Sequence, residues 1–260
     1  MKTPTTAMKF SAPDWCFAAQ AGCEAAEYYG RLREIGYDAV EMVEPARRAA
    51  AAAAGLKILN LAGPGMTVGL NRQENHPTLI PQIKAAIEEA AATGAKAVIV
   101  FSGNRAGQFD SAGQCNCRIG LDAVIPLAAA RGVELHFEAL NSYDHADYQA
   151  DSLRYLFSLV KAVNSPVFKA LLDIYHMEMM GDDCASAIPS FLPLLGHLHV
   201  AAIRTRTVPE AGGYIDYAWI VKAAVKAGYA GYWGMEFLPT GDVFAELAQA
   251  RTLFLNYVGR

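Results

Sequence analysis

Short runs of β-forming residues alternate with longer helical patterns along the whole of this 260-residue chain. We predict strands at residues 8–12, 39–43, 57–61, 97–101, 133–138, 168–173, 197–201 and 232–237. We predict helices at residues 23–35, 79–93, 120–131, 152–163, 217–227 and 243–257, and the alanine-rich stretch 46–54 is a further helix former. Strand-then-helix alternation of this kind is typical of a parallel α/β fold.

The number of these units limits the fold further. Eight strand-plus-helix units in a chain of this length favour a closed (β/α)8 barrel, the TIM barrel, over an open sheet. No linker, charge block or low-complexity segment divides the sequence, so we expect residues 1–260 to form one TIM-barrel domain. Glycines at expected helix ends, such as Gly36 and Gly228, suit the left-handed residue that commonly follows a helix.

Polar residues stand at the ends of the last four predicted strands. They are Glu138, Asp173, His199 and Glu236. The intervals between them are 35, 26 and 37 residues (138 to 173, 173 to 199 and 199 to 236), about one strand-plus-helix unit each. In a TIM barrel, residues at equivalent strand ends converge on the C-terminal face, where the functional site lies. We therefore expect these four side chains to meet at one barrel mouth.

Such a set has the composition of a metal site. Any one of these residues alone has an ordinary explanation, such as a helix cap, but four at matched strand ends favour metal binding. Carboxylate and imidazole ligands together suit Mg²⁺, Mn²⁺, Co²⁺ or Zn²⁺, and the absence of cysteine from these four positions argues against a closed structural zinc site. We expect one divalent ion that polarises a carbonyl, with Glu138 and Glu236 moving protons beside it.

Composition excludes several classes of partner. The net charge of −4 and pI near 5.9 give no basic footprint for nucleic acid. No apolar run approaches the ~20 residues of a membrane span, and residues 1–9 lack the apolar core of a secretory signal. The five cysteines form no CxxC pair and are odd in number, which favours a reduced, cytoplasmic setting. We expect a small-molecule substrate, and whether the chain forms a homo-oligomer stays an open question.

Four segments resemble the xylose isomerase-like TIM-barrel superfamily of sugar isomerases and epimerases, and within it the hydroxypyruvate isomerase group. They are FEALNSYDHADYQ at 137–149, NSPVFKALLDIYHMEMM at 164–180, GHLHVA at 196–201 and GYWGMEFLP at 231–239. The resemblance implies that Glu138 and Glu236 are both metal ligands and acid/base groups. It implies that Asp173 is a ligand and that His199 takes a third-ligand position where the family has Gln or His.

The same resemblance implies roles for residues around the metal. His176, three residues after Asp173, is implied to contact substrate, and Arg206 takes the place of a substrate-contacting arginine, although Arg204 competes for that place. Three positions depart from the pattern, because Ala202, Tyr214 and Leu238 replace polar or charged residues. These departures leave the metal ligands intact and change the substrate surroundings, so we expect a substrate larger or less charged than hydroxypyruvate.

Other residues at strand ends carry weaker expectations. His145, in the loop after Glu138, is a candidate pocket residue, and Trp15 is a candidate pocket wall. Glu41 ends the second strand, where we expect an ion pair with Arg47 or Arg48 in preference to a substrate contact.

The sequence as a whole predicts a metal-dependent enzyme of carbohydrate metabolism that isomerises a hydroxy-ketone or sugar through an enediolate. A ketose 3-epimerase or an inosose dehydratase on the same site is the alternative. An apurinic endonuclease-like DNA repair enzyme is less favoured by the net charge, and a non-catalytic sugar-binding barrel is less favoured by the complete ligand set. The exact substrate, the native metal and the oligomeric state stay open.

Overall fold

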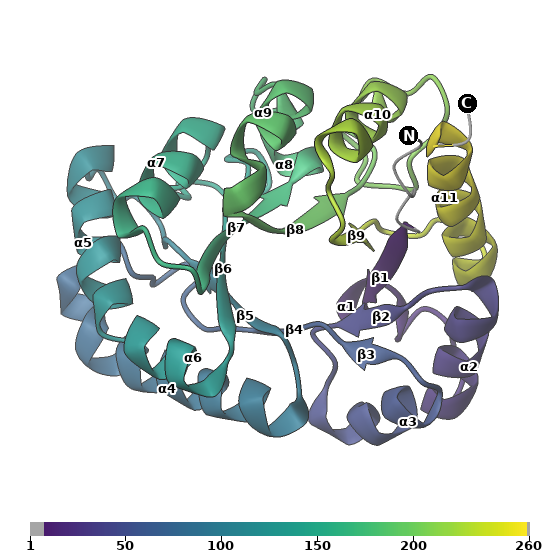
Figure 1. The fold of residues 1–260 in the computed structure, drawn as a ribbon, viewed down its shortest axis with the longest axis horizontal. Helices are drawn as coiled ribbons and strands as arrows, with labels where there is room; N and C mark the ends of the chain where they lie inside the picture. Colours follow the sequence, from purple (N-terminus) through teal and green to yellow (C-terminus); the bar gives the residue numbers. More distant parts are fainter. Residues whose placement is uncertain (1–7, 259–260) are drawn as a thin grey trace.

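The computed structural model describes residues 8–258, which fold into a ring of parallel strands surrounded by helices (Figure 1). The first seven residues of the 1–9 segment lie outside the described residues. The strands are β1 (Lys9–Pro13), β2 (Ala39–Glu41), β3 (Lys57–Ile58), β4 (Asn60–Ala62), β5 (Ala97–Phe101), β6 (Glu134–Glu138), β7 (Phe168–Asp173), β8 (Leu195–Val200) and β9 (Tyr232–Met235). All their pairings are parallel, in the order β3-β2-β1-β9-β8-β7-β6-β5-β4.

The predicted third strand, 57–61, is divided in two, and this break is where the barrel closes. β3 pairs with β2 and β4 pairs with β5, with only Leu59 between the two segments. The Leu59 N–H donates to Val40 O at 2.8 Å, and Leu59 O accepts from the Lys96 N–H at 3.0 Å. Leu59 thus bonds to both flanking strands. The expected TIM barrel is confirmed, with eight strand positions built from nine segments.

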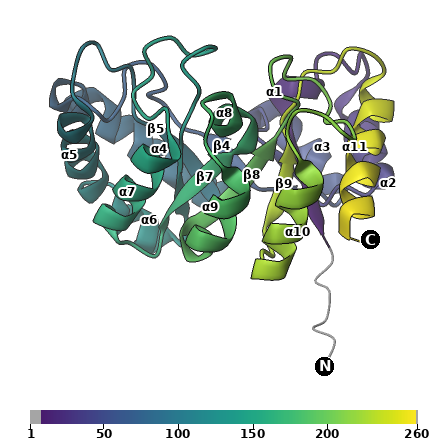
Figure 2. The same cartoon turned by 90° about the horizontal axis from the view of Figure 1, so that it is seen from above.

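Helices cover the outside of the strand ring, and the described loops gather at its two ends (Figures 1 and 2). They are α1 (Asp14–Phe17), α2 (Ala25–Ile35), α3 (Arg48–Ala53), α4 (His76–Thr93), α5 (Asp110–Asp122), α6 (Ile125–Arg131), α7 (Leu153–Val163), α8 (Ile174–Met179), α9 (Cys184–Phe191), α10 (Tyr217–Ala227) and α11 (Val243–Val258). Short 3₁₀ turns lie at Pro45–Arg47, Gln73–Asn75 and Leu192–Leu194.

Local sequence explains where these helices begin and end. Ser152 accepts a hydrogen bond from the Tyr155 N–H and so caps α7, whose apolar face packs on the barrel. Gly36 and Gly228 end α2 and α10 in the left-handed conformation, as predicted. The prediction of a single helix at 120–131 is wrong. Two helices occupy this part of the chain, α5 from Asp110 and α6 to Arg131, and Pro126 near the start of α6 cannot donate the hydrogen bond that a continuous helix would need.

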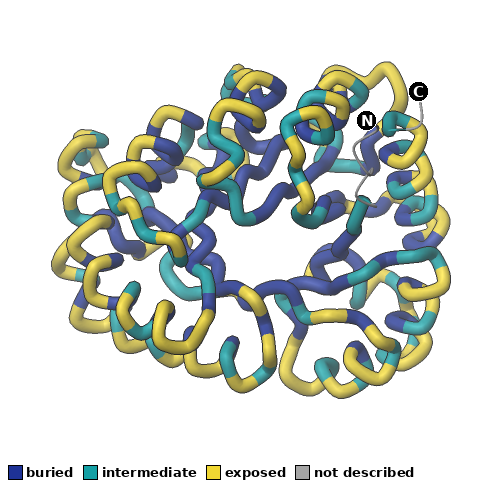
Figure 3. The backbone as a smooth tube through the Cα atoms, in the orientation of Figure 1, coloured by how far each residue is buried: buried dark blue, intermediate teal, exposed yellow. Residues whose placement is uncertain are grey.

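The strands form the most buried part of the chain (Figure 3). All five residues of β5 are buried, since its outer face packs on helices and its inner face fills the barrel. None of the described helices combines the length and hydropathy of a membrane span. The five buried carboxylates of the described residues all lie at carboxyl ends of strands: Glu41, Glu138 and Asp173 are the last residues of β2, β6 and β7, and Asp14 and Glu236 directly follow β1 and β9. The fold thus gathers its buried charge at one mouth.

Candidate metal centre

Strand register brings the four residues predicted from the sequence to one end of the barrel. Glu138 and Asp173 are the last residues of β6 and β7, and Glu236 follows β9 directly. His199 is the register partner of Asp173 on β7 and of Gly234 on β9. The side chains therefore share one level of the barrel mouth, and each is at most 6% exposed.

Three of these carboxylates form a compact cluster with a histidine. One oxygen each from Glu138, Asp173 and Glu236 and one ring nitrogen of His176 lie within 4.8 Å of one another. Asp173 also begins α8, because its Oδ1 accepts a hydrogen bond from the His176 N–H at 3.2 Å. That cap fixes His176 beside the carboxylates, although the sequence predicted it as a substrate contact and not as part of the cluster.

His199, the predicted nitrogen ligand, faces two of these carboxylates with its Nδ1 atom. Its Nδ1 is 3.3 Å from Glu236 Oε2 and 3.6 Å from Glu138 Oε1, and it makes no hydrogen bond within the described residues. Its Nε2 is 2.9 Å from Glu41 Oε2. A carboxylate accepts but does not donate, so Nε2 carries a proton, and Nδ1 is the ring nitrogen that faces the two glutamates.

The same reasoning gives His176 a different role. Its Nδ1 is an acceptor, because the Asn141 N–H donates to it at 3.2 Å. Nε2 therefore carries the ring proton and lies 3.5 Å from Asp173 Oδ2, without a hydrogen-bond partner among the described residues. A protonated Nε2 cannot ligate a metal but can donate to a substrate oxygen. The hydrogen-bond network thus separates a histidine suited to ligation, His199, from one suited to substrate contact, His176.

The prediction for Glu41 is wrong. Glu41 is fully buried, with Oε1 3.0 Å from His197 Nε2 and Oε2 2.9 Å from His199 Nε2. The two arginines expected as its partners bind elsewhere: Arg47 pairs with Asp14 and Arg48 with Glu89. Glu41 points into the barrel because its strand alternates toward the interior at this position, where β8 supplies the two histidines.

Arg206, and not Arg204, reaches the carboxylates. Its Nη2 donates to Glu236 Oε2 at 2.8 Å, and its guanidinium lies 5.2 Å from the ring centroid of Trp15 and 5.3 Å from that of Tyr175. Trp15 also donates from Nε1 to Glu236 Oε1 at 3.1 Å, which fits its predicted place in the pocket wall. Sequence reasoning missed Tyr175, which lies in α8; its position next to His176, just after the end of β7, was the available signal.

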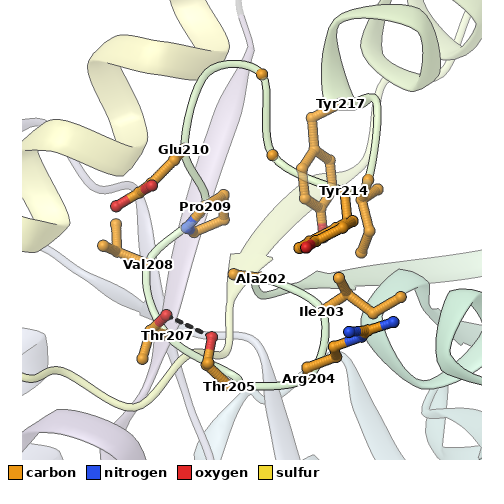
Figure 4. A pocket seen from close by; sticks show the side chains of 13 residues that line it. Ala202, Ile203, Arg204, Thr205, Thr207, Val208, Pro209, Glu210, Tyr214 and Tyr217 are labelled. Atoms are coloured by element: carbon orange, nitrogen blue, oxygen red, sulfur yellow. Dashed lines mark hydrogen bonds between the residues drawn. The ribbon is translucent and has the colours of Figure 1, made fainter.

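Arg204 lines a separate open cavity of about 650 Å³, formed by the segment between β8 and α10 together with Tyr217 (Figure 4). Its guanidinium lies 5.1 Å from the ring centroid of Tyr214, and Thr205 and Thr207 join their hydroxyls at 2.8 Å on the same segment. None of the three carboxylates of the cluster lines this cavity. Of the two candidate arginines, only Arg206 is placed to meet a molecule at the barrel mouth.

His145, the last residue predicted for the pocket, is half-buried beside His176. The two ring centroids are 5.4 Å apart at an interplanar angle of 63°. Burial and the nearby Arg206 charge lower the pKa of His145, which favours its neutral form. It is therefore placed as a neutral donor or acceptor at the edge of the cluster.

The crowding of buried acids separates the pKa values of the two glutamates. Burial raises the pKa of Glu138, and the charge of Glu236 raises it further. Burial likewise raises the pKa of Glu236, but His199 and Arg206 outweigh it and hold this pKa below its ordinary value. Burial and the Glu236 charge raise the pKa of Asp173 well above its usual range. Pairs of acids whose surroundings push their pKa values apart are typical of acid/base sites.

These protonation preferences predict a pH-dependent metal affinity. Glu138, Asp173 and His199 all have raised pKa values, so they hold protons to a higher pH than ordinary carboxylates and imidazoles do. A metal needs its ligands deprotonated, so it competes with those protons. Mn²⁺ affinity should rise between pH 6 and pH 8 by about tenfold per pH unit for each proton displaced. Calorimetry in buffers of different ionisation enthalpy counts those protons; a pH-independent Kd with no proton release would contradict it.

Comparison with known proteins agrees with this architecture. A family model described as "Xylose isomerase-like TIM barrel" matches residues 17–253. A "Putative hydroxypyruvate isomerase" of Streptomyces coelicolor is 30% identical over 171 residues, 63% of this chain and 60% of that protein. A protein of the same name from Xenopus laevis is 30% identical over 112 residues, 43% of this chain and 41% of that protein. The matches thus span 41% to 60% of these two relatives' lengths.

Solved structures show the same fold. An AP endonuclease, family 2, from Brucella melitensis superposes with a TM-score of 0.82 at 21% identity, covering 95% of this chain and 99% of that one. A D-psicose 3-epimerase from Clostridium cellulolyticum H10 gives a TM-score of 0.80 at 18% identity, covering 96% and 99%. At these identities the likeness concerns the fold alone. The match of the family model over residues 17–253 shows that the chain belongs to the xylose isomerase-like TIM barrel family.

Proposed function

We propose that this chain is a divalent-metal-dependent isomerase or epimerase of a small hydroxy-ketone or sugar. The observation that carries the proposal is the pair of buried glutamates, Glu138 and Glu236, which face one imidazole nitrogen and have pKa values moved in opposite directions. The curated relatives named as isomerases of hydroxypyruvate and of 2-oxo-tetronate support the same class of reaction.

The residues present suit a divalent cation. Three carboxylates, Glu138, Asp173 and Glu236, are buried close together, and burial together with the charge of Glu236 raises the pKa values of Glu138 and Asp173. His199 adds an Nδ1 atom with no hydrogen-bond partner among the described residues. Oxygen and imidazole donors of this kind suit Mg²⁺, Mn²⁺, Co²⁺ or Zn²⁺. When bound, such an ion would act as a Lewis acid on the substrate carbonyl.

The protein groups then divide the proton transfers. Glu236, held ionised by His199 and Arg206, removes the proton from the carbon next to the carbonyl, and the C–H electron pair moves into an enediolate. Glu138, the second glutamate that faces Nδ1 of His199, returns a proton to the neighbouring carbon or to the opposite face, and proton exchange with solvent restores the starting state of both glutamates. The first outcome is isomerisation and the second is epimerisation. The Nε2–H of His176 is placed to hold a substrate oxygen.

The residues at the rim of the barrel mouth favour one class of substrate over another. Leu238 is 38% exposed and its N–H donates to Arg206 O at 2.7 Å, so an apolar side chain stands beside the arginine. Arg206 itself is already paired with Glu236. The departure at Tyr214 has less weight, because that side chain lies over Arg204 and away from the carboxylates. A rim with little free positive charge suits an uncharged polyol ketone better than a small keto acid.

The test of the proposal begins with metal and proton transfer. Metal analysis of the purified protein should find about one divalent ion per chain, and the metal-loaded protein should exchange deuterium from solvent into the carbon next to the ketone of its substrate. A panel of hydroxypyruvate, ketopentoses, ketohexoses and inososes at one fixed metal is then compared by kcat/KM.

We expect a ketose or inosose to exceed hydroxypyruvate by about tenfold or more in kcat/KM, the size of discrimination that weakly selective apolar walls give. A wide margin in favour of hydroxypyruvate would mean that Leu238 and its neighbours are neutral changes. Absence of both metal and deuterium exchange with every member of the panel would contradict the proposed function itself.

A further inference from the structure

Next to the carboxylate cluster lies a second buried group, formed by Glu41, His197 and His199, of which the proposed reaction uses only His199. Each carboxylate oxygen of Glu41 faces one ring nitrogen, at 3.0 Å for His197 Nε2 and 2.9 Å for His199 Nε2. Asn60 also donates from Nδ2 to Glu41 Oε2 at 2.5 Å. All four side chains are at most 1% exposed. Glu41 is therefore held at both oxygens by donors from two other strands, β4 and β8.

β9 passes this group and has a glycine, Gly234, at the point of closest approach. A Cβ atom added at Gly234 would lie 2.6 Å from Glu41 Oε1, 2.6 Å from His199 Cδ2 and 2.8 Å from His197 Nε2. Such separations are too short for real contacts, so any larger residue at 234 must displace the group. Gly234 is also the register partner of His199. The barrel interior is thus shaped around this arrangement of Glu41 and the two imidazoles.

The hydrogen bond to Glu41 fixes the orientation of the His199 ring. A carboxylate that accepts from Nε2 fixes both the tautomer and the rotation of the ring, and here that leaves Nδ1 facing Glu138 and Glu236. Histidines that ligate metals almost always donate their other ring N–H to a carboxylate or carbonyl in this way. We propose that Glu41 is a positioning residue for the metal centre, which holds Nδ1 of His199 toward the ion while Asn60 and His197 hold Glu41. This inference rests on the proposed function.

A second ion bound by Glu41, His197 and His199 is the rival explanation, since these atoms also lie close together. Three donors already occupy three of the about four acceptor sites of the Glu41 carboxylate, which favours the hydrogen-bonded arrangement. Metal stoichiometry decides between the two. One ion per chain fits a positioning role, and two ions per chain would make Glu41 a ligand and overturn the inference.

The main experiment measures Mn²⁺ affinity by calorimetry in wild type, Glu41→Gln, His199→Gln and the double variant. Glu41→Gln should weaken binding about 10- to 100-fold, the usual effect of losing such a partner. In the His199→Gln background the same change should add no more than about twofold, because the effect of Glu41 acts through that ring. An additive effect in the double variant would mean that Glu41 is merely structural, and would overturn the inference.

Glu134→Gln is the matched control. It removes a carboxylate from a similar pair, because His136 Nε2 lies 2.8 Å from Glu134 Oε2, and Glu134 is the first residue of β6 whereas Glu138 of the cluster is the last. Its Mn²⁺ affinity should equal that of wild type. Equal weakening by Glu134→Gln and Glu41→Gln would point to a general loss of barrel stability and overturn the inference.

A measurement on wild type keeps the inference testable if Glu41→Gln does not fold. The six histidines can be followed by ¹⁵N NMR as Zn²⁺ is added. His199 should keep its Nε2 proton while its Nδ1 signal moves; a metal-bound Nε2 would overturn the inference. Wild type that binds no divalent ion would overturn the proposed function and this inference with it. If wild type binds the ion and folded Glu41→Gln binds it with the same affinity, the inference about Glu41 is overturned and the proposed function is not.

Discussion

Glu236→Gln should lower kcat by about a thousandfold on the preferred substrate, within the range that general acid/base catalysis contributes. His199 and Arg206 lower the pKa of Glu236, so the carboxylate is ionised and ready to accept a proton. A glutamine of the same size can still offer one oxygen to a metal or to Arg206, but its amide cannot accept the proton. The loss should therefore fall on turnover and much less on metal content.

The measurement is kcat with the metal content determined on the same sample. Glu210→Gln is the control, because Glu210 is exposed and lines the separate cavity between β8 and α10; its kcat should match wild type. Near-normal turnover in metal-loaded Glu236→Gln protein would remove Glu236 from acid/base duty. The proton acceptor would then have to be sought among the other groups of the cluster.

The sequence predicted those elements of the fold that are determined by residues close together in the chain. The strands predicted at 97–101 and 168–173 match β5 and β7 to the residue, because continuous apolar runs between turns identify buried parallel strands. The division of the third strand at Leu59 was missed, since it arises from bonding to two different neighbours across the sheet. The short helices α8 and α9 were missed because each is under three turns and has little periodic pattern.

For the site as well, the contacts set by strand alignment were predictable, and the contacts between distant parts of the chain were not. Glu138, Asp173 and Glu236 were predictable as neighbours because the barrel aligns strand ends. The role of Glu41 was not, because its partners are 156 and 158 residues away and nothing near it in sequence reveals which way its side chain points. The choice between Arg204 and Arg206 likewise depended on a loop in which both residues have positive φ angles, 69° and 52°. Sequence periodicity carries no information about such a loop.

Asp173→Asn should weaken Mn²⁺ binding by about a hundredfold or more, because losing a ligand costs at least as much as the 10- to 100-fold loss of an outer partner. The effect should be separable from folding. Asp173 Oδ1 caps α8 by accepting from the His176 N–H, and the carbonyl oxygen of an asparagine makes the same bond. Because burial and Glu236 raise the pKa of Asp173, a neutral side chain there also relieves repulsion in the metal-free protein. Its metal-free Tm should therefore equal or exceed that of wild type.

Thermal unfolding at increasing Mn²⁺ measures both quantities, since a ligand that binds only the folded state raises Tm according to its concentration relative to Kd. Wild type should show a large increase, and Asp173→Asn should show almost none at the same Mn²⁺ concentrations. Asp183→Asn is the matched control, because Asp183 caps α9 by accepting from the Ser186 N–H at 3.0 Å and is exposed. A wild-type Mn²⁺ response in Asp173→Asn would exclude Asp173 as a ligand and leave it only as the cap of α8.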